Sequence, residues 1–170
     1  MVKASGLFFT NGRHYLGALQ KKFDTVYISG LGGSRKEYET PIHTAIRETL
    51  EELFHFSQVP QYLIEEIVFS LSPWKQYYCE QSMEYTFFEC SFSDLEEICK
   101  IVFERGLRSP LYDVIPSTIG DLVLLRKQNP EAEVISLAIL PVTKDALIVA
   151  RHFQKDVELV FQEREKKTRT

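Results

Sequence analysis

The chain has 170 residues, of which 44% are hydrophobic and 26% charged. This size and composition allow one globular domain to bury a core unaided, so we expect a single domain over residues 1–170. The net charge of -4 and the pI near 5.6 exclude a bulk positive field that would hold a nucleic-acid backbone. The N-terminal segment lacks the apolar run of a signal peptide, and no stretch reaches transmembrane length. We therefore expect an intracellular, cytoplasmic protein with no membrane partner, and nothing in the composition indicates an oligomeric state.

The three cysteines, Cys79, Cys90 and Cys99, leave one thiol unpaired in any intramolecular disulfide scheme. Their spacing also lacks the CxxC pattern typical of metal sites. We expect buried, reduced thiols.

The first third of the chain predicts three strands followed by a helix. Residues 7–9 and 15–19 are apolar and flank an Asn-Gly turn, which is typical of a hairpin. Residues 26–28 form a third strand, and the glycine-rich segment 29–33 is expected to be a loop. Thr40 followed by Pro41 predicts the start of a helix of about fourteen residues with one apolar side.

The rest of the chain alternates between the two kinds of element. We expect strands over residues 64–71 and 85–92, with a polar and aromatic connection over 72–83 between them. Helices are expected over 94–105 and 119–127, a strand over 134–140, and a long helix over 144–166. This order predicts an α/β fold with a mixed sheet and helices packed against it.

Three carboxylates share one face of the helix that begins at Pro41. At about 100° per residue, Glu48, Glu51 and Glu52 fall on an arc away from the apolar side. No lysine or arginine lies on that arc, so like charges repel there. A hard divalent cation such as Mg2+ or Mn2+ would relieve the repulsion, since it prefers carboxylate oxygens. Glutamate-rich faces are also common as solvated surfaces, so these three residues alone do not establish a site.

The spacing around the glutamates is more specific. Gly33, Glu39, Arg47 and the three glutamates fit Gly-x5-Glu-x7-Arg-Glu-x2-Glu-Glu, a match that chance gives in roughly one register in ten million. Residues 33–55 thereby resemble the box of the Nudix hydrolase family. The run 47–54 is also similar to boxes in Nudix proteins of large DNA viruses. The resemblance implies an α/β/α sandwich, with extra helices after the box, and hydrolysis of a nucleoside diphosphate linked to another moiety.

The resemblance also implies roles for individual residues. Glu48, Glu51 and Glu52, with the carbonyl of Gly32, would hold the metal ion. Glu39 would pair with Arg47 and, with Gly33, support the loop of the box.

Four residues depart from the family pattern. Thr49 and His55 replace aliphatic residues, Leu31 replaces a common proline, and Phe54 replaces the glycine that ends the helix. None removes a charged ligand, but Phe54 leaves the end of the helix without its usual glycine.

Candidate residues outside the helix are fewer. Glu131 or Glu133, just before the strand at 134–140, would supply a further ligand or a base. Arg35 and Lys36 would contact phosphate oxygens, and Trp74 would stack on a nucleobase.

Three functions are compatible with the sequence. The first is hydrolysis of a small nucleotide: a nucleoside di- or triphosphate, a nucleotide sugar, ADP-ribose or a dinucleotide polyphosphate. The second is mRNA decapping, which needs a basic track from Arg105, Arg108, Arg126 and Lys127. The third is a non-catalytic binding module of the same fold, which normally has altered metal-binding glutamates.

Overall fold

The computed structural model describes residues 1–78, 84–143 and 151–170. Its strands are β1 (Ala4–Thr10), β2 (His14–Lys22), β3 (Thr25–Ser29), β4 (Leu31–Ser34), β5 (Lys75–Tyr78), β6 (Tyr85–Ser91) and β7 (Val134–Pro141). Its helices are α1 (Pro41–Phe54), α2 (Gln61–Leu71), α3 (Phe92–Glu104), α4 (Ile119–Leu124) and α5 (Arg151–Thr168).

The strands form one mixed sheet with β1 at its centre. The main order is β3-β2-β1-β6-β5, while β4 pairs with β1 and β7 pairs with β2. Strand β1 runs parallel to β6 and antiparallel to β2 and β4. The predicted mixed sheet is therefore confirmed.

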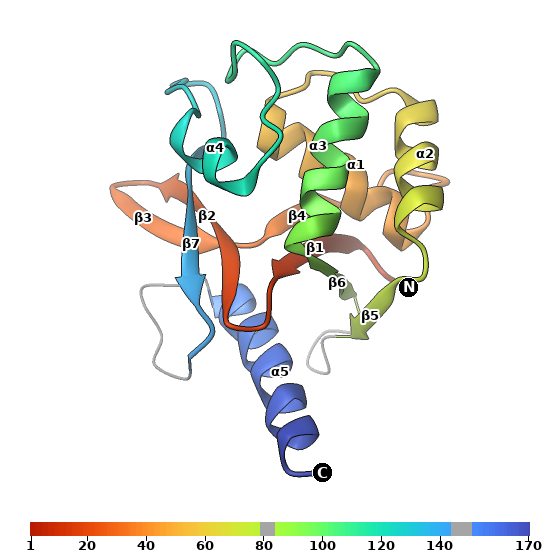
Figure 1. Cartoon of the computed structure of the whole chain (residues 1–170), viewed down its shortest axis with the longest axis vertical. Helices are drawn as coiled ribbons and strands as arrows, with labels where there is room; N and C mark the ends of the chain where they lie inside the picture. The colour runs from red at the N-terminus through yellow and green to blue at the C-terminus, as the bar shows by residue number, and fades with distance from the viewer. Residues whose placement is uncertain (79–83, 144–150) are drawn as a thin grey trace.

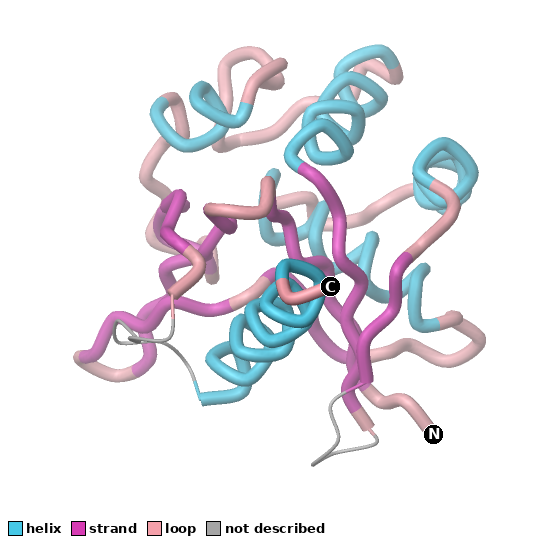
Figure 2. The backbone as a smooth tube through the Cα atoms, turned by 60° about the horizontal axis from the view of Figure 1, so that its bottom comes forward, coloured by secondary structure: helices cyan, strands magenta, loops and turns pink. Residues whose placement is uncertain are grey.

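Helices cover both faces of this sheet (Figure 1). Side chains alternate along β1, so Leu7 and Phe9 join the large core beneath α1 to α4, and Phe8 joins a smaller core on the other face. The smaller core is completed by apolar residues of α5, among them Phe153 and Val157. Figure 2 brings α5 forward, with the strands behind it. This is the expected α/β/α arrangement, with helices α2 to α5 following the box.

Helix α1 begins as its sequence predicts. Thr40 accepts a hydrogen bond from the backbone N–H of His43, and Pro41 occupies the first turn. The hairpin of β1 and β2, strands β3, β6 and β7, and helix α3 are also confirmed. Helix α4 ends at Leu124, earlier than expected. The predicted start of the last helix at 144 lies outside the described residues.

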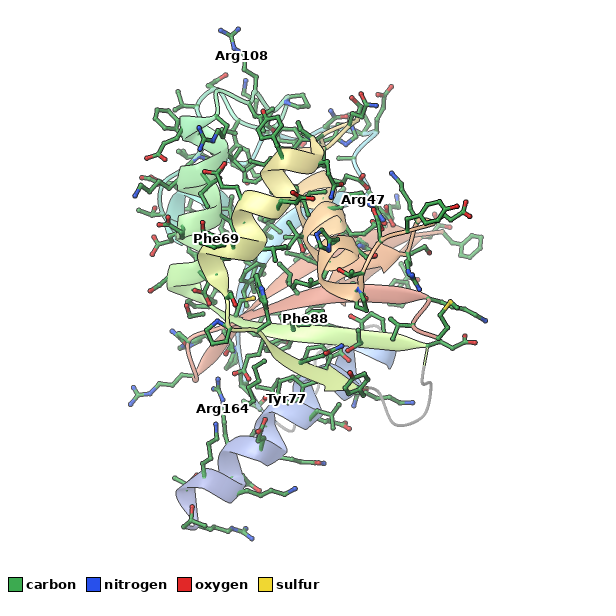
Figure 3. The ribbon with its side chains drawn as sticks, turned by 90° about the vertical axis from the view of Figure 1, so that its right-hand side faces the viewer. Arg47, Phe69, Tyr77, Phe88, Arg108 and Arg164 are labelled. Atoms are coloured by element: carbon green, nitrogen blue, oxygen red, sulfur yellow. The ribbon has the colours of Figure 1, made fainter. Side chains whose placement is uncertain are left out.

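The predicted strand over residues 64–71 is wrong, because this segment belongs to helix α2. Its buried side chains are Leu63, Ile64 and Ile67, which lie on one side of a helix, whereas Phe69 is exposed (Figure 3). The apolar residues Ile64, Ile67, Val68 and Leu71 recur at the spacing of a helix, with Glu65 and Glu66 between them, so the strand prediction assigned the segment the wrong period.

Two short strands lie where we expected irregular segments. Strand β4 occupies part of the predicted loop 29–33, and β5 lies within the predicted connection 72–83. Each of these strands forms by pairing with another strand, and the local sequence pattern holds no information about that pairing. Cys90 and Cys99 are buried free thiols, as expected, and Cys79 lies outside the described residues. Within the described ranges, no helix is long and apolar enough to cross a membrane.

Candidate active site

The glycine loop brings backbone close to the carboxylate face of α1. A Cβ atom on Gly33 would lie 2.4 Å from the carboxylate carbon of Glu48, so only glycine leaves room for that side chain. A Cβ atom on Gly32 would lie 2.6 Å from the Cα atom of Gly6 in β1. The two glycines therefore allow β4 to lie between β1 and the glutamates.

Glu52 is the buried member of the carboxylate group, with 9% of its surface exposed. Its Oε2 atom accepts a hydrogen bond of 3.1 Å from the backbone N–H of Gly32. In the described part of the chain, no lysine or arginine forms an ion pair with Glu52. A buried carboxylate with so little compensation is unfavourable unless a cation joins it.

Arg47 lies between the loop and the helix, with 5% of its side chain exposed (Figure 3). Its Nε donates to Glu39 Oε1 at 2.6 Å, and its Nη2 donates to Glu39 Oε2 at 3.0 Å and to the carbonyl of Ser34 at 2.8 Å. The pair that the resemblance implied is therefore present, and it joins the loop to α1.

Arg47 also changes the expected electrostatics of the arc. Its Nη1 donates to Glu48 at 2.8 Å and to Glu51 at 3.2 Å. Our premise that no cation meets this face is wrong, because Arg47 reaches it from the edge of the arc. Glu48 and Glu51 are partly neutralised, so the unrelieved repulsion concentrates on Glu52.

The pKa values follow these contacts. Burial alone would raise the pKa of Glu39, but hydrogen bonds from Arg47, the Lys36 backbone and Thr44 lower it to about 2. Burial raises the pKa of Glu48 despite its bond to Arg47. Burial also raises the pKa of Glu52 well above its usual range, against the hydrogen bond from Gly32.

Glu133 directly precedes β7 and is exposed. Its charge contributes to the raised pKa of both Glu48 and Glu52. Glu131 is exposed in the preceding turn, where its backbone N–H binds the Asn129 side chain. Of the two candidates, Glu133 is the one whose charge acts on the box glutamates.

The donor chemistry suits a hard divalent cation, because carboxylate oxygens are its preferred ligands and Glu52 is a buried carboxylate that forms no ion pair with a described lysine or arginine. In the described residues, however, no three acidic, histidine or cysteine side chains are grouped closely enough to hold a metal ion. The bonds from Arg47 to Glu48 and Glu51 account for this, since they direct both carboxylates toward the guanidinium.

The other candidates lie around this group. Lys36 Nζ is 3.9 Å from Glu51 Oε1, and Arg35 Nε donates to the carbonyl of Glu39. Trp74 is half-buried and packs edge-to-face against Phe88, with ring centroids 6.2 Å apart. The structure therefore gives Trp74 a packing role.

The structure brings two of the four residues predicted for the basic track together, because Arg108 and Lys127 line one surface groove. Arg105 binds Glu66, and Lys127 pairs with Asp113. Arg126 is turned inward and donates to the carbonyls at the end of α1. Only Arg108 of the four extends freely from the surface (Figure 3).

The sequence did not predict the hydrogen bonds that Arg126 and Ser109 make with the end of α1. These two residues bind the carbonyls of residues 52–54, where the family pattern has a glycine. In the sequence, the replacement of that glycine by Phe54 was the one local sign of these contacts. Without the glycine, the last carbonyls of the helix need hydrogen-bond donors from other residues. His55 itself has a left-handed φ of 54°.

No protein-family model matches the chain, and no curated protein matches it. Three solved structures resemble its fold. The bifunctional NMN adenylyltransferase/ADP ribose pyrophosphatase of Francisella tularensis, complexed with AMP and a manganese ion, is 11% identical with a TM-score of 0.51. A NUDIX hydrolase from Nitrosomonas europaea is 13% identical with a TM-score of 0.47. The Ap4A hydrolase of C. elegans is 14% identical with a TM-score of 0.45.

These similarities extend over almost the whole chain. The matches cover 96% of it for the Francisella and Nitrosomonas proteins and 98% for the C. elegans protein. They cover 42% of the Francisella chain, 90% of the Nitrosomonas chain and 99% of the C. elegans chain. The similarity to the Francisella structure concerns the fold alone, and it agrees with the α/β arrangement of sheet and helices described above.

Proposed function

We propose that this chain is a divalent-metal-dependent pyrophosphohydrolase of the Nudix type. Its substrate would be a nucleoside diphosphate linked to another moiety: a nucleotide, a nucleotide sugar, ADP-ribose or a dinucleotide polyphosphate. The observation that carries the proposal is the buried carboxylate of Glu52, which accepts a hydrogen bond from Gly32 of the glycine loop and lies on the same helix as Glu48 and Glu51.

Glu48, Glu51 and Glu52, with the carbonyl of Gly32, would hold Mg2+ or Mn2+. When bound, such an ion neutralises charge on phosphate oxygens and activates the attacking water. Glu133, at the exposed start of β7, would be the further ligand or the base that takes a proton. Arg47 and Glu39 would hold the loop in position without contacting the substrate.

An open groove of about 610 Å3 supports a path for the phosphates. It is lined by the N-terminal residues and by the loop that enters α1, including Lys3, Arg35 and Lys36. Lys36 links this groove to the carboxylates through its 3.9 Å approach to Glu51. Three cationic side chains beside four carboxylates would suit a substrate whose phosphates bridge the metal ion and the groove.

The test is a hydrolysis screen on the four substrate classes with Mg2+ and with Mn2+. We expect the wild-type chain to hydrolyse at least one class. Glu52→Gln should abolish that activity with the fold retained, since it removes a charge with little change of shape. Glu104→Gln, on the exposed face of α3, is the matched control and should keep full activity.

Two outcomes contradict the proposal. Equal activity in wild type and Glu52→Gln would remove the role of the carboxylate group. Nucleotide binding without hydrolysis under either metal would identify the chain as the non-catalytic binding module.

A further inference from the structure

The end of α1 is closed by side chains from a distant part of the chain. The carbonyl of Glu52 accepts a 2.9 Å hydrogen bond from Arg126 Nη2, and the carbonyl of Leu53 accepts from Arg126 Nη1. The carbonyl of Phe54 accepts from the Ser109 hydroxyl. These donors satisfy carbonyls that a helix otherwise leaves without partners.

The same guanidinium also binds the start of β7. Arg126 Nη2 donates to the carbonyl of Val134 at 3.0 Å, so one nitrogen joins the last turn of α1 to the first residue of β7. Val134 directly follows Glu133, and Glu52 is the buried carboxylate of α1. One planar side chain therefore sets the separation of the two segments that carry these glutamates.

The Arg126 backbone is itself held in place. The residue follows α4, where the N–H of Leu125 donates to Asp121 at 2.9 Å and the N–H of Lys127 donates to Leu111 at 2.8 Å. The guanidinium is half-buried, and its Nε has no hydrogen-bond partner among the described residues. An arginine fixed at both ends can hold two segments in register, whereas a mobile one on the surface cannot.

Because one nitrogen of Arg126 binds the carbonyls of both Glu52 and Val134, the backbone of Glu133 lies next to the last turn of α1, which carries carboxylates of its own. Repulsion would move the start of β7 away from α1. We infer that Arg126 is a positioning residue, which holds Glu133 beside Glu52 and so completes the carboxylate group for a divalent cation. The inference rests on the proposed function, since it deepens the description of that same site.

The experiment measures the affinity of the full chain for Mn2+ alone, in wild type, Arg126→Lys and Arg126→Met. Lysine keeps the charge, but its ammonium is a compact donor on a flexible stem and lacks the planar fork with which Arg126 binds the carbonyls of Glu52, Leu53 and Val134 together. Loss of an outer partner of a metal site typically lowers affinity about 10- to 100-fold, and we expect this range for both variants. Arg105→Met removes an exposed arginine whose side chain binds half-buried Glu66 of α2, and it should leave the affinity unchanged.

Repeating the measurement in a Glu133→Gln chain distinguishes a positioning role of Arg126 from a general effect on stability. If Arg126 acts through Glu133, then Arg126→Lys should change Mn2+ affinity by less than about 3-fold in a Glu133→Gln chain, because the coupled partner is already gone. The same loss in both backgrounds would overturn the inference, and so would unchanged affinity in Arg126→Lys. If neither Arg126 variant folds, Arg126→Gln takes their place in both backgrounds with the same two outcomes, because Glu133→Gln alone reports on Glu133 and not on Arg126.

The proposed function and this inference fail separately. A wild-type chain that binds Mn2+ and shows the coupling, but hydrolyses no nucleotide, would contradict the proposed function only. A chain that hydrolyses nucleotides without coupling between Arg126 and Glu133 would contradict the inference only.

Discussion

Replacing Asp156 by asparagine is expected to stabilise the protein at pH 8 and to have little effect at pH 4. Asp156 lies on α5 with 1% of its surface exposed, beside the small core that holds this helix on the sheet. Its Oδ2 accepts a hydrogen bond of 3.3 Å from the Tyr85 hydroxyl, and its Oδ1 has no partner among the described residues. Burial raises the pKa of Asp156 from 3.8 to about 8, against the hydrogen bond from Tyr85.

The magnitude follows from this pKa difference. Below about pH 4 the carboxyl is protonated in both the folded and the unfolded chain, so its ionisation costs nothing. Between pH 4 and 8 the unfolded chain releases the proton and the folded chain keeps it, so stability falls by about 1.4 kcal/mol per pH unit. Above pH 8 both are ionised, and the cost levels off at no more than about 6 kcal/mol.

The assay is urea denaturation of wild type and Asp156→Asn at intervals from pH 4 to pH 9. The unfolding free energy of Asp156→Asn should exceed that of wild type by an amount that grows as the pH rises from 4 to 8. Glu158→Gln removes the same charge from an exposed position of α5, and its difference from wild type should stay within about 0.5 kcal/mol. Wild-type and Asp156→Asn curves that run parallel from pH 4 to pH 9 would refute the reasoning.

Three further predictions concern the carboxylate group and its surroundings. Mg2+ or Mn2+ at a hundred times its dissociation constant should stabilise the fold by about 2.7 kcal/mol. Glu52→Gln should remove that shift and raise the metal-free melting temperature, whereas Glu51→Gln should not raise it because Arg47 already binds Glu51. A wild-type melting curve that neither ion moves would exclude the metal site. Glu39→Gln should lower activity less than Glu52→Gln does, and it should remove a stabilisation that is present above pH 4.5 and lost as pH falls through the Glu39 pKa of about 2. Equal activity losses would contradict the structural role of Glu39, and acid unfolding curves test its pH dependence. Trp74→Ala should destabilise the protein by an amount on the order of 3 kcal/mol, measured by denaturation, and leave KM unchanged. A raised KM with unchanged stability would show instead that Trp74 binds the substrate.

Local patterns in the sequence were sufficient to predict most elements. The Thr40-Pro41 start and the apolar periodicity of α1 are properties of neighbouring residues, and so is the Asn-Gly turn between β1 and β2. The wrong strand at 64–71 was an error of period: its apolar residues recur three and four apart, which is the spacing of a helix with one buried side. Strand β4 was missed because its hydrogen bonds are made with β1, far away in the sequence.

In the candidate site, too, some features follow from the sequence alone and others from the tertiary structure. The helical spacing of Glu48, Glu51 and Glu52 by itself determines that the three carboxylates share a face, because the geometry of a helix relates residues three and four apart. Tertiary structure alone decides that Arg47 neutralises two of them and leaves Glu52 buried against Gly32. The charge of Glu133 acts on Glu48 and Glu52, and this too follows from the fold.

Arg126 is the clearest example of a feature that tertiary structure alone decides. As sequence it is one more surface cation, yet its guanidinium binds carbonyls more than seventy residues away in α1 and eight residues away in β7. No periodicity or cap contains that information, since a hydrogen bond between distant segments exists only after the chain has folded. The sequence therefore determined the carboxylate face of α1. The fold decided which charges surround that face and which residues hold them in place.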